Sequence, residues 1–173
     1  MKRKSVRIYS FTGTGSCLAL KLAEKLKQEG YVCTGYTVAR FAEDKRLQRL
    51  NDGWKQEIGA SWGEHALVFI GAAGIAIRAI APFVKDKFTD PPVIVLDEKG
   101  TFAIPLLSGH VGGGVTLAKV LAEYTGGRAV ITTATDVQKK FAADVFAMEN
   151  GLIITAVSYT HLRAHETVLI SYA

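Results

Sequence analysis

One histidine stands where an imidazole could act as a base. His110 follows Gly109 at the expected start of a helix, inside the glycine-rich run Ser108–Gly114. The positive end of a helix dipole disfavours the protonated imidazole, so the ring can accept a proton near neutral pH. A histidine that only caps the helix explains the same pattern. Asp136 is a second catalytic candidate, although its place in the capping box Thr135-Asp-Val-Gln138 also explains it.

Four loops rich in glycine or threonine follow expected strands: Thr12–Ser16, Gly71–Gly74, Ser108–Gly114 and Thr132–Asp136. In an open α/β sheet, ligands lie beyond the carboxyl ends of the strands, where helix starts favour anions. Tight turning alone also explains such glycines. Arg78, one turn into the helix after the second loop, could bind a carboxylate. The candidate substrate-binding residues are Thr12, Gly13, Gly71, Gly74, Arg78, Ser108, Gly109, Gly112, Gly113 and Thr133.

The first loop leaves an alternative open. Thr12-Gly-Thr-Gly-Ser16 resembles the phosphate loop of flavodoxin-like proteins, which would place an FMN phosphate on the amides of Thr14 to Ser16. Flavin binding also needs aromatic loops, whereas Trp54 and Trp62 lie on an expected weak helix. The alternative is therefore a non-catalytic flavodoxin-like module that binds a flavin or a phosphorylated ligand.

Strand and helix patterns alternate along the chain, and this alternation is what must position the loops. The fold class expected is α/β: an open, mainly parallel sheet with helices on both faces, doubly wound and flavodoxin-like, with a β-hairpin insertion at Asp97–Gly100. A strand that simply turned back there would carry Ser108–Gly114 to the opposite edge of the sheet. One cleft shared by the loops therefore requires the hairpin to project beyond the sheet. The expected strands are 5–11, 31–39, 66–70, 93–96, 101–107 and 128–132; the expected helices are 18–30, 54–62, 75–84, 114–124 and 137–150, and 40–53 is expected to be loop or a short helix.

The composition is that of an ordinary globular protein. The 173 residues are 49% hydrophobic and 21% charged, with a net charge of +5, which excludes a disordered or collagenous chain. No apolar run reaches the roughly 18–20 residues that span a bilayer, and no secretory signal is visible, so we expect a cytoplasmic protein. Cys17 and Cys33 have neither a disulfide framework nor metal-ligand spacing. The basic N-terminal third suits an anionic ligand or a solvated surface, and no nucleic-acid motif accompanies it.

Several runs resemble the N-terminal region of the cobalt-precorrin-5A hydrolase family. These are Phe69-Ile-Gly-Ala-Ala-Gly-Ile-Ala-Ile-Arg78, Ile104-Pro-Leu-Leu-Ser-Gly-His110, Ile131-Thr-Thr-Ala-Thr-Asp136 and Phe141-Ala-Ala-Asp-Val-Phe146, and the resemblance covers roughly residues 5–155. Gly114 departs from the family pattern, in which Ala-Asn usually follows the two glycines.

The resemblance implies a cytoplasmic carbon–carbon hydrolase of anaerobic cobalamin (vitamin B12) biosynthesis. Such an enzyme opens the lactone of a cobalt tetrapyrrole and releases acetaldehyde. The substrate carries the cobalt, so no cofactor and no protein metal site are expected, and neither a nucleic acid nor a membrane is an expected partner. Lactone opening needs a base and oxyanion donors. From the residues themselves, we assign these roles to His110 and to the amides of Gly112 and Gly113.

We expect three segments: an N-terminal α/β ligand-binding domain over 1–136, the start of a middle region over 137–155, and an unrelated tail over 156–173. Ser158 to Thr167 resembles a translated adapter or vector stretch. The expectation is therefore a truncated chain with an artefactual end, whose apolar residues have no strand partner. His161 and His165, four residues apart, are not expected to bind a metal.

Overall fold

The computed structural model describes residues 5–43, 46–86, 89–109 and 112–133, together with strand residues 153–154 and 170–171. The chain divides into two compact units, Met1–Ile131 and Thr132–Ala173. In the second unit, β8 (Ile153–Ile154) pairs antiparallel with β9 (Ile170–Ser171). Ile170 and Ser171 thus have a strand partner, contrary to expectation. His110, Asp136 and the helix expected over 137–150 lie outside the described residues.

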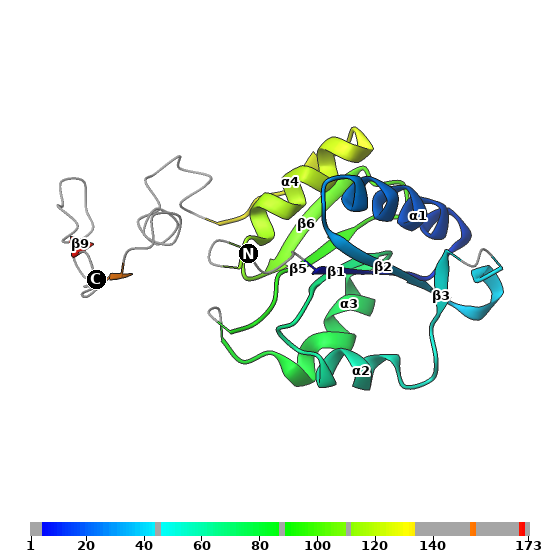
Figure 1. The fold of residues 1–173 in the computed structure, drawn as a ribbon, viewed down its shortest axis with the longest axis horizontal. Helices are drawn as coiled ribbons and strands as arrows, with labels where there is room; N and C mark the ends of the chain where they lie inside the picture. Colours follow the sequence, from blue (N-terminus) through cyan, green and yellow to red (C-terminus); the bar gives the residue numbers. More distant parts are fainter. Residues whose placement is uncertain are drawn as a thin grey trace. The chain divides into compact units, whose positions relative to one another are not determined.

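The first unit is built on a seven-stranded sheet (Figure 1). Its strands lie in the order β3-β2-β1-β4-β5-β6-β7. All neighbouring pairs from β3 to β5 are parallel, β6 is antiparallel to β5, and β7 is parallel to β6. The expected open, mainly parallel α/β fold is confirmed. The strands are β1 (Ser5–Ser10), β2 (Val32–Thr37), β3 (Leu47–Arg49), β4 (Ala66–Ile70), β5 (Val93–Leu96), β6 (Phe102–Leu107) and β7 (Arg128–Ala129).

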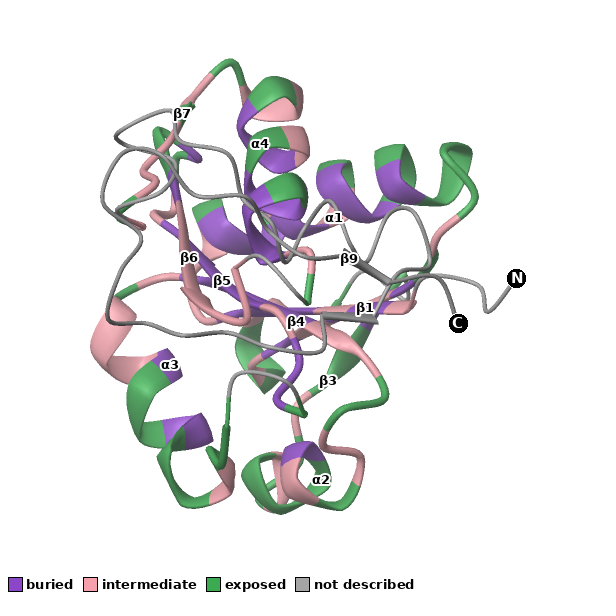
Figure 2. Ribbon diagram, turned by 90° about the vertical axis from the view of Figure 1, so that its left-hand side faces the viewer, coloured by how far each residue is buried: buried purple, intermediate pink, exposed green. Residues whose placement is uncertain are grey.

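Helices cover both faces of the sheet, as the ribbons in Figures 1 and 2 show. One face carries α1 (Gly13–Gln28) and α4 (Gly114–Thr125), and the other carries α2 (Trp54–Ala60) and α3 (Ala73–Ile80). Each face has its own apolar cluster, because successive strand residues point to opposite sides. Ile8 packs in the α1/α4 cluster, whereas Phe69 packs in the α2/α3 cluster. Burying a side chain of this kind contributes about 1.5–3 kcal/mol.

The strand order reverses at the centre of the sheet. From β1 the chain moves outward to β2 and β3, and it then returns to place β4 on the other side of β1. In doubly wound sheets a ligand crevice opens at this reversal, beyond the carboxyl ends of the strands. The loops after β1 and β4 therefore flank the position where the fold favours ligand binding.

The segment between β2 and α2 differs from the expected loop or short helix. A 3₁₀ turn occupies Ala39–Phe41, and β3 then adds an edge strand beside β2. Leu47 is the only buried residue of β3, so the segment carries little of the apolar pattern by which strands are recognised. Two further elements differ in extent: α1 begins at Gly13, inside the loop expected over Thr12–Ser16, and the strand expected over 128–132 is limited to β7. The other described elements lie close to their expected places, including a shortened α3 followed by a 3₁₀ turn that contains Pro82.

The expected hairpin is present, but it does not project beyond the sheet. β6 folds back along the whole of β5, from Leu96 opposite Ala103 to Val93 opposite Leu107. The Asp97 carboxylate holds the turn by accepting hydrogen bonds from the amides of Lys99 and Phe102, at 2.9 and 2.7 Å. Burial alone would raise the pKa of Asp97, but these backbone hydrogen bonds outweigh it and lower that pKa. β6 therefore ends where β5 begins.

Candidate functional site

The loop after β1 is closed around its own helix cap. Thr12 Oγ1 accepts a hydrogen bond from the amide of Gly15 at 3.0 Å, and the Thr12 carbonyl accepts one from the amide of Ser16 at 2.9 Å. Gly15 is buried against the side chain of Ile70, where a Cβ would lie 3.2 Å from Ile70 Cγ2. Two of the amides that a flavin phosphate would need are thus already occupied, which goes against the flavodoxin-like alternative.

Below this loop lies a buried cluster of hydroxyl groups. Ser16 Oγ lies 2.6 Å from Thr37 Oγ1 and 3.2 Å from Ser10 Oγ, and it donates to the Thr12 carbonyl at 2.8 Å. Ser10 and Thr37 are completely buried. Because every hydroxyl has a partner inside the protein, this cluster joins α1 to β1 and β2 and offers nothing to a ligand.

The loop after β4 also packs closely. Gly71 has a φ of +150° and donates its amide to the Leu96 carbonyl at 2.8 Å, which joins the ends of β4 and β5. A Cβ on Gly74 would lie 3.1 Å from a guanidinium nitrogen of Arg78, so the glycine leaves room for that side chain to fold back over the helix start. Backbone conformation thus explains the glycine at position 71, and packing explains the glycine at position 74.

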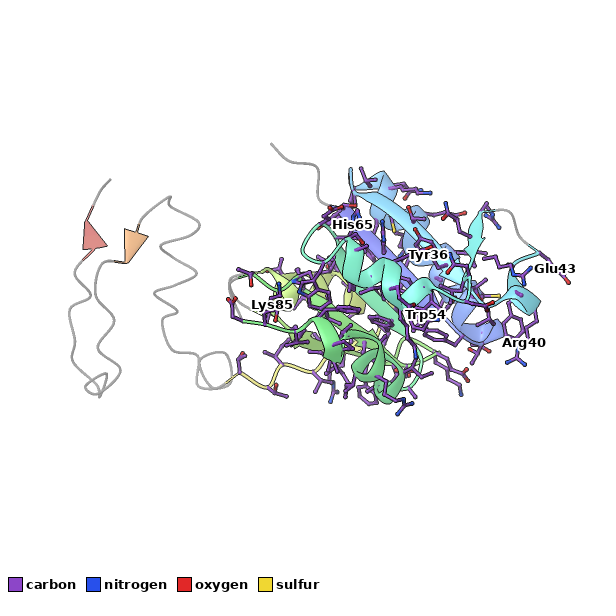
Figure 3. The ribbon with its side chains drawn as sticks, turned by 90° about the horizontal axis from the view of Figure 1, so that it is seen from below. Tyr36, Arg40, Glu43, Trp54, His65 and Lys85 are labelled. Carbon is purple, nitrogen blue, oxygen red and sulfur yellow. The ribbon has the colours of Figure 1, made fainter. Side chains whose placement is uncertain are left out.

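A pocket of about 540 Å³ opens beside these loops, at the end of the sheet where β1, β2, β3 and β4 finish. We call this end the carboxyl edge, and the opposite end the amino edge. Arg78 is the only predicted ligand-binding residue in the pocket wall. Figure 3, seen from below, shows Trp54 toward the same end of the sheet as Arg40, and Lys85 toward the other. The pocket is lined by Phe11, Val38, Ala39, Arg49, Leu50, Asn51, Asp52, Trp54, Lys55, Ile75 and Arg78.

Sequence reasoning missed most of this wall. Arg49, Trp54 and Lys55 lie in or just after the segment expected to be loop. Arg49 reaches the pocket because β3 pairs with β2 and aligns Arg49 with Thr37, whereas Trp54 and Lys55 reach it from the first turn of α2. The basic character of the N-terminal third was the one available signal, since Arg49 and Lys55 contribute to it.

The loop after β6 lies at the amino edge. Ser108 Oγ donates to the Asp90 carbonyl at 2.6 Å, and a Cβ on Gly112 would lie 3.5 Å from Pro92 Cγ; both Asp90 and Pro92 precede β5. Gly109 belongs to the same loop, since its carbonyl accepts a hydrogen bond from the amide of Val115 at 2.9 Å.

The expectation of one cleft shared by all the loops is therefore wrong. Thr12, Gly13, Gly71, Gly74 and Arg78 lie at the carboxyl edge. Ser108, Gly109, Gly112 and Gly113 lie at the amino edge, because β6 reverses the chain before delivering them. Thr133 belongs to the second unit.

The amino-edge loop is fixed by tight backbone packing. Gly113 has a φ of +79°, a conformation that favours glycine, and it precedes α4. The Gly114 amide donates to the Ser108 carbonyl at 3.0 Å, so the loop closes on itself. The nearby carboxylate of Asp90 is buried and accepts hydrogen bonds from Trp62 Nε1 at 2.9 Å and from the amide of Lys85. These contacts secure the loop before β5.

Within the ranges that the structure describes, no three His, Cys, Asp or Glu side chains gather to hold a metal ion. The same ranges contain no helix both long and apolar enough to cross a bilayer. Fold and site together define a doubly wound α/β protein with a cationic pocket at the carboxyl edge of its sheet.

Comparison with known proteins identifies the family. Residues 58–136 match the family model described as "Cobalamin synthesis G N-terminal". The chain is 39% identical over 159 residues to the cobalt-precorrin-5A hydrolase of Salmonella typhimurium, a match that covers 86% of this chain and 41% of that protein. It is also 39% identical over 110 residues to the enzyme of the same name from Priestia megaterium, covering 60% of this chain and 29% of the relative. The chain belongs to the cobalt-precorrin-5A hydrolase family, and it spans about two fifths of the length of the Salmonella relative.

A solved structure agrees with this assignment. The crystal structure of a cobalamin biosynthesis protein G homologue from Sulfolobus solfataricus superposes with a TM-score of 0.58 and 26% sequence identity. The match covers 74% of this chain and 36% of that one. The α/β fold described above is therefore also found in a cobalamin biosynthesis homologue.

Proposed function

We propose that this chain acts as the N-terminal part of a cobalt-precorrin-5A hydrolase. The enzyme would open the lactone of a cobalt tetrapyrrole and release acetaldehyde during anaerobic cobalamin biosynthesis in the cytoplasm. The observation that carries the proposal is the 39% identity over 159 residues with the Salmonella enzyme of that name. In this proposal the cobalt enters with the substrate, and the protein needs no cofactor of its own.

Opening the lactone requires a base that activates water and donors that stabilise the oxyanion at the carbonyl, and it breaks the acyl C–O bond to give a carboxylate and an alcohol. Acetaldehyde leaves when that hydroxyl gives up its proton and the carbon–carbon bond to the macrocycle breaks, with the electron pair staying on the macrocycle. We assign the base to His110, with Asp136 as the alternative, and the donors to the amides of Gly112 and Gly113. The tight loop around Gly112 supports this assignment, because donors fixed before the reaction stabilise developing charge best. The assignment places the reacting lactone at the amino edge.

The test is acetaldehyde release from cobalt-precorrin-5A, measured with the full-length enzyme and with this chain alone. We expect the full-length enzyme to release one aldehyde for each lactone opened. His110→Ala should lower turnover by about 10²–10⁴-fold if the imidazole is the base. Turnover within a few-fold of the parent would move the base to Asp136, tested with Asp136→Asn, or to the remainder of the full-length enzyme. Absence of acetaldehyde from the intact enzyme would refute the proposed function.

A further inference from the structure

We infer that the pocket at the carboxyl edge binds the carboxylate-bearing rim of a planar tetrapyrrole. This inference rests on the proposed function, which identifies the ligand. The pocket itself gives the location of binding. It assigns binding, and not cleavage, to a wall of which only Arg78 was a candidate from the sequence.

The pocket has the size and position of a ligand site. Its volume of about 540 Å³ lies within the roughly 300–1,000 Å³ of small-molecule pockets. Its walls come from the end of β1, the turn after β2, the end of β3, and helices α2 and α3. Five elements thus meet beside the reversal of strand order, where doubly wound folds bind ligands.

The charged side chains of the wall suit several carboxylates at once. Arg49, Lys55 and Arg78 come from three different elements and are exposed, and Asp52 is the only acidic residue in the wall. None of the ion pairs found among the described residues involves these three cations. A guanidinium binds a carboxylate through two parallel hydrogen bonds, and an ammonium binds it as a point charge. Three cations on separate elements match a ligand whose carboxylates are spread around a rim.

The aromatic residues of the wall suit the flat ring that carries those carboxylates. The ring centroids of Trp54 and Phe11 lie 5.6 Å apart, and Tyr9 packs against Trp54 with a centroid distance of 5.8 Å. Trp54 and Phe11 are half-buried, so each ring is held by the core and still reaches the pocket. An aromatic wall of this kind binds a flat apolar ring at little entropic cost, since few torsions remain to be fixed.

The pocket and the loop that carries Gly112 and Gly113 lie at opposite edges of the sheet, so the inference concerns binding and leaves the hydrolysis assignment to its own test. Gly109 and Gly112 lie at the amino edge, and a strand of five residues such as β4 spans about 16 Å. A tetrapyrrole rim seated against Trp54 lies across the sheet from the amides of Gly112 and Gly113.

The test titrates the 173-residue chain with uroporphyrin, whose every pyrrole carries an acetate and a propionate, and follows the Soret absorbance. The pocket variant Arg49→Gln/Lys55→Gln/Arg78→Gln should raise Kd at least about tenfold at constant ionic strength, since it removes three side chains that make charge-assisted hydrogen bonds to carboxylates. The matched control is Lys21→Gln/Lys25→Gln/Lys99→Gln, in the separate groove between α1 and α4. It removes the same charge and should change Kd by less than about threefold. Circular dichroism checks that both variants are folded.

Equal weakening in the two triple variants would overturn the inference, because the binding would then follow net charge alone. So would a parent chain that does not bind uroporphyrin. Mesoporphyrin, which carries propionates on one side only, should bind the parent chain at least about tenfold more weakly; equal affinity would contradict recognition through several carboxylates. Uroporphyrin has no lactone, so this result does not depend on hydrolysis. Binding in the pocket without acetaldehyde release from the intact enzyme would refute the proposed function and leave the inference in place.

Discussion

Gly112 illustrates how a residue suited to chemistry can be required by packing. A Cβ at this position would lie 2.5 Å from the Cβ of Ser108 and 2.8 Å from its carbonyl oxygen. The backbone oxygen cannot move aside without opening the loop. A glycine-rich run in a sequence therefore shows that the chain turns tightly, and it does not show whether the freed amides face a ligand.

Gly112→Ala should destabilise the protein by about 1–3 kcal/mol, the usual cost of overpacking. Gly13→Ala is the matched control, because its Cβ would make only an ordinary contact of 3.5 Å with Phe41. We expect the melting temperature to fall by several degrees for Gly112→Ala and by clearly less for Gly13→Ala. Equal melting temperatures would show that the loop adapts and that packing does not require this glycine.

The two cysteines should differ in reactivity. Cys33 is buried, and burial raises the pKa of its thiol from 9.0 to about 11, whereas Cys17 is exposed. At pH 8, iodoacetamide should modify Cys17 and leave Cys33 intact, as mass spectrometry of the labelled peptides would show. The raised pKa also means that this thiol contributes stability below pH 9 that is lost as the pH rises toward 11. Rapid labelling of Cys33 in the folded protein would contradict its burial.

At the scale of elements, the start of α1 depends on one side chain. Thr12→Ala removes the acceptor of the Gly15 amide and should cost about 1 kcal/mol in urea unfolding. Thr12→Ser keeps the hydroxyl and should retain most of the stability. Thr14→Ala, at an exposed position in the first turn, serves as the control. A Thr12→Ala protein as stable as the Thr14→Ala protein would show that the cap contributes little.

The sequence predicts those elements whose apolar spacing is regular. β4 and β5 are continuous apolar runs buried on both faces, and Gly30 follows the C-cap of α1 with a φ of +84°, which explains the choice of glycine. β3 was missed because Leu47 is its only buried residue. The hairpin was found from its turn, but the turn alone does not show how far β6 pairs along β5, and the length of that pairing decided at which edge Ser108 lies.

At the scale of the whole molecule, the members of both apolar clusters among the residues that the structure describes come from the first unit. Removing residues 156–173 should therefore leave the melting temperature within a few degrees, a change of about 1 kcal/mol for a chain of this size. Leu121→Ala, at a completely buried position, should lower the free energy of unfolding by about 2–5 kcal/mol. It serves as the control for a loss of core packing in the same assay. A tail deletion as damaging as Leu121→Ala would show that the last residues are part of the folded core.

The pocket could not be predicted as a whole from the sequence. Alternating strands and helices establish the open sheet, and its carboxyl edge follows from that. The wall, however, joins Phe11, Arg49, Trp54 and Arg78, which only the strand order brings together. None of these residues has a spacing to the others that a motif could express.

The aromatic residues under the pocket also give the molecule an optical property. Tyr36, Tyr9 and Phe69 stack across three neighbouring strands, with centroids 5.2 and 5.1 Å apart, and Trp54 lies 5.8 Å from Tyr9. Light absorbed by the two tyrosines should pass to this indole by resonance energy transfer, because Tyr9 lies 5.8 Å from it and Tyr36 stacks on Tyr9. Emission excited through the tyrosines would then respond to anything that touches Trp54. The protein thus carries an internal reporter at the wall of its own pocket, and the core holds that reporter in place.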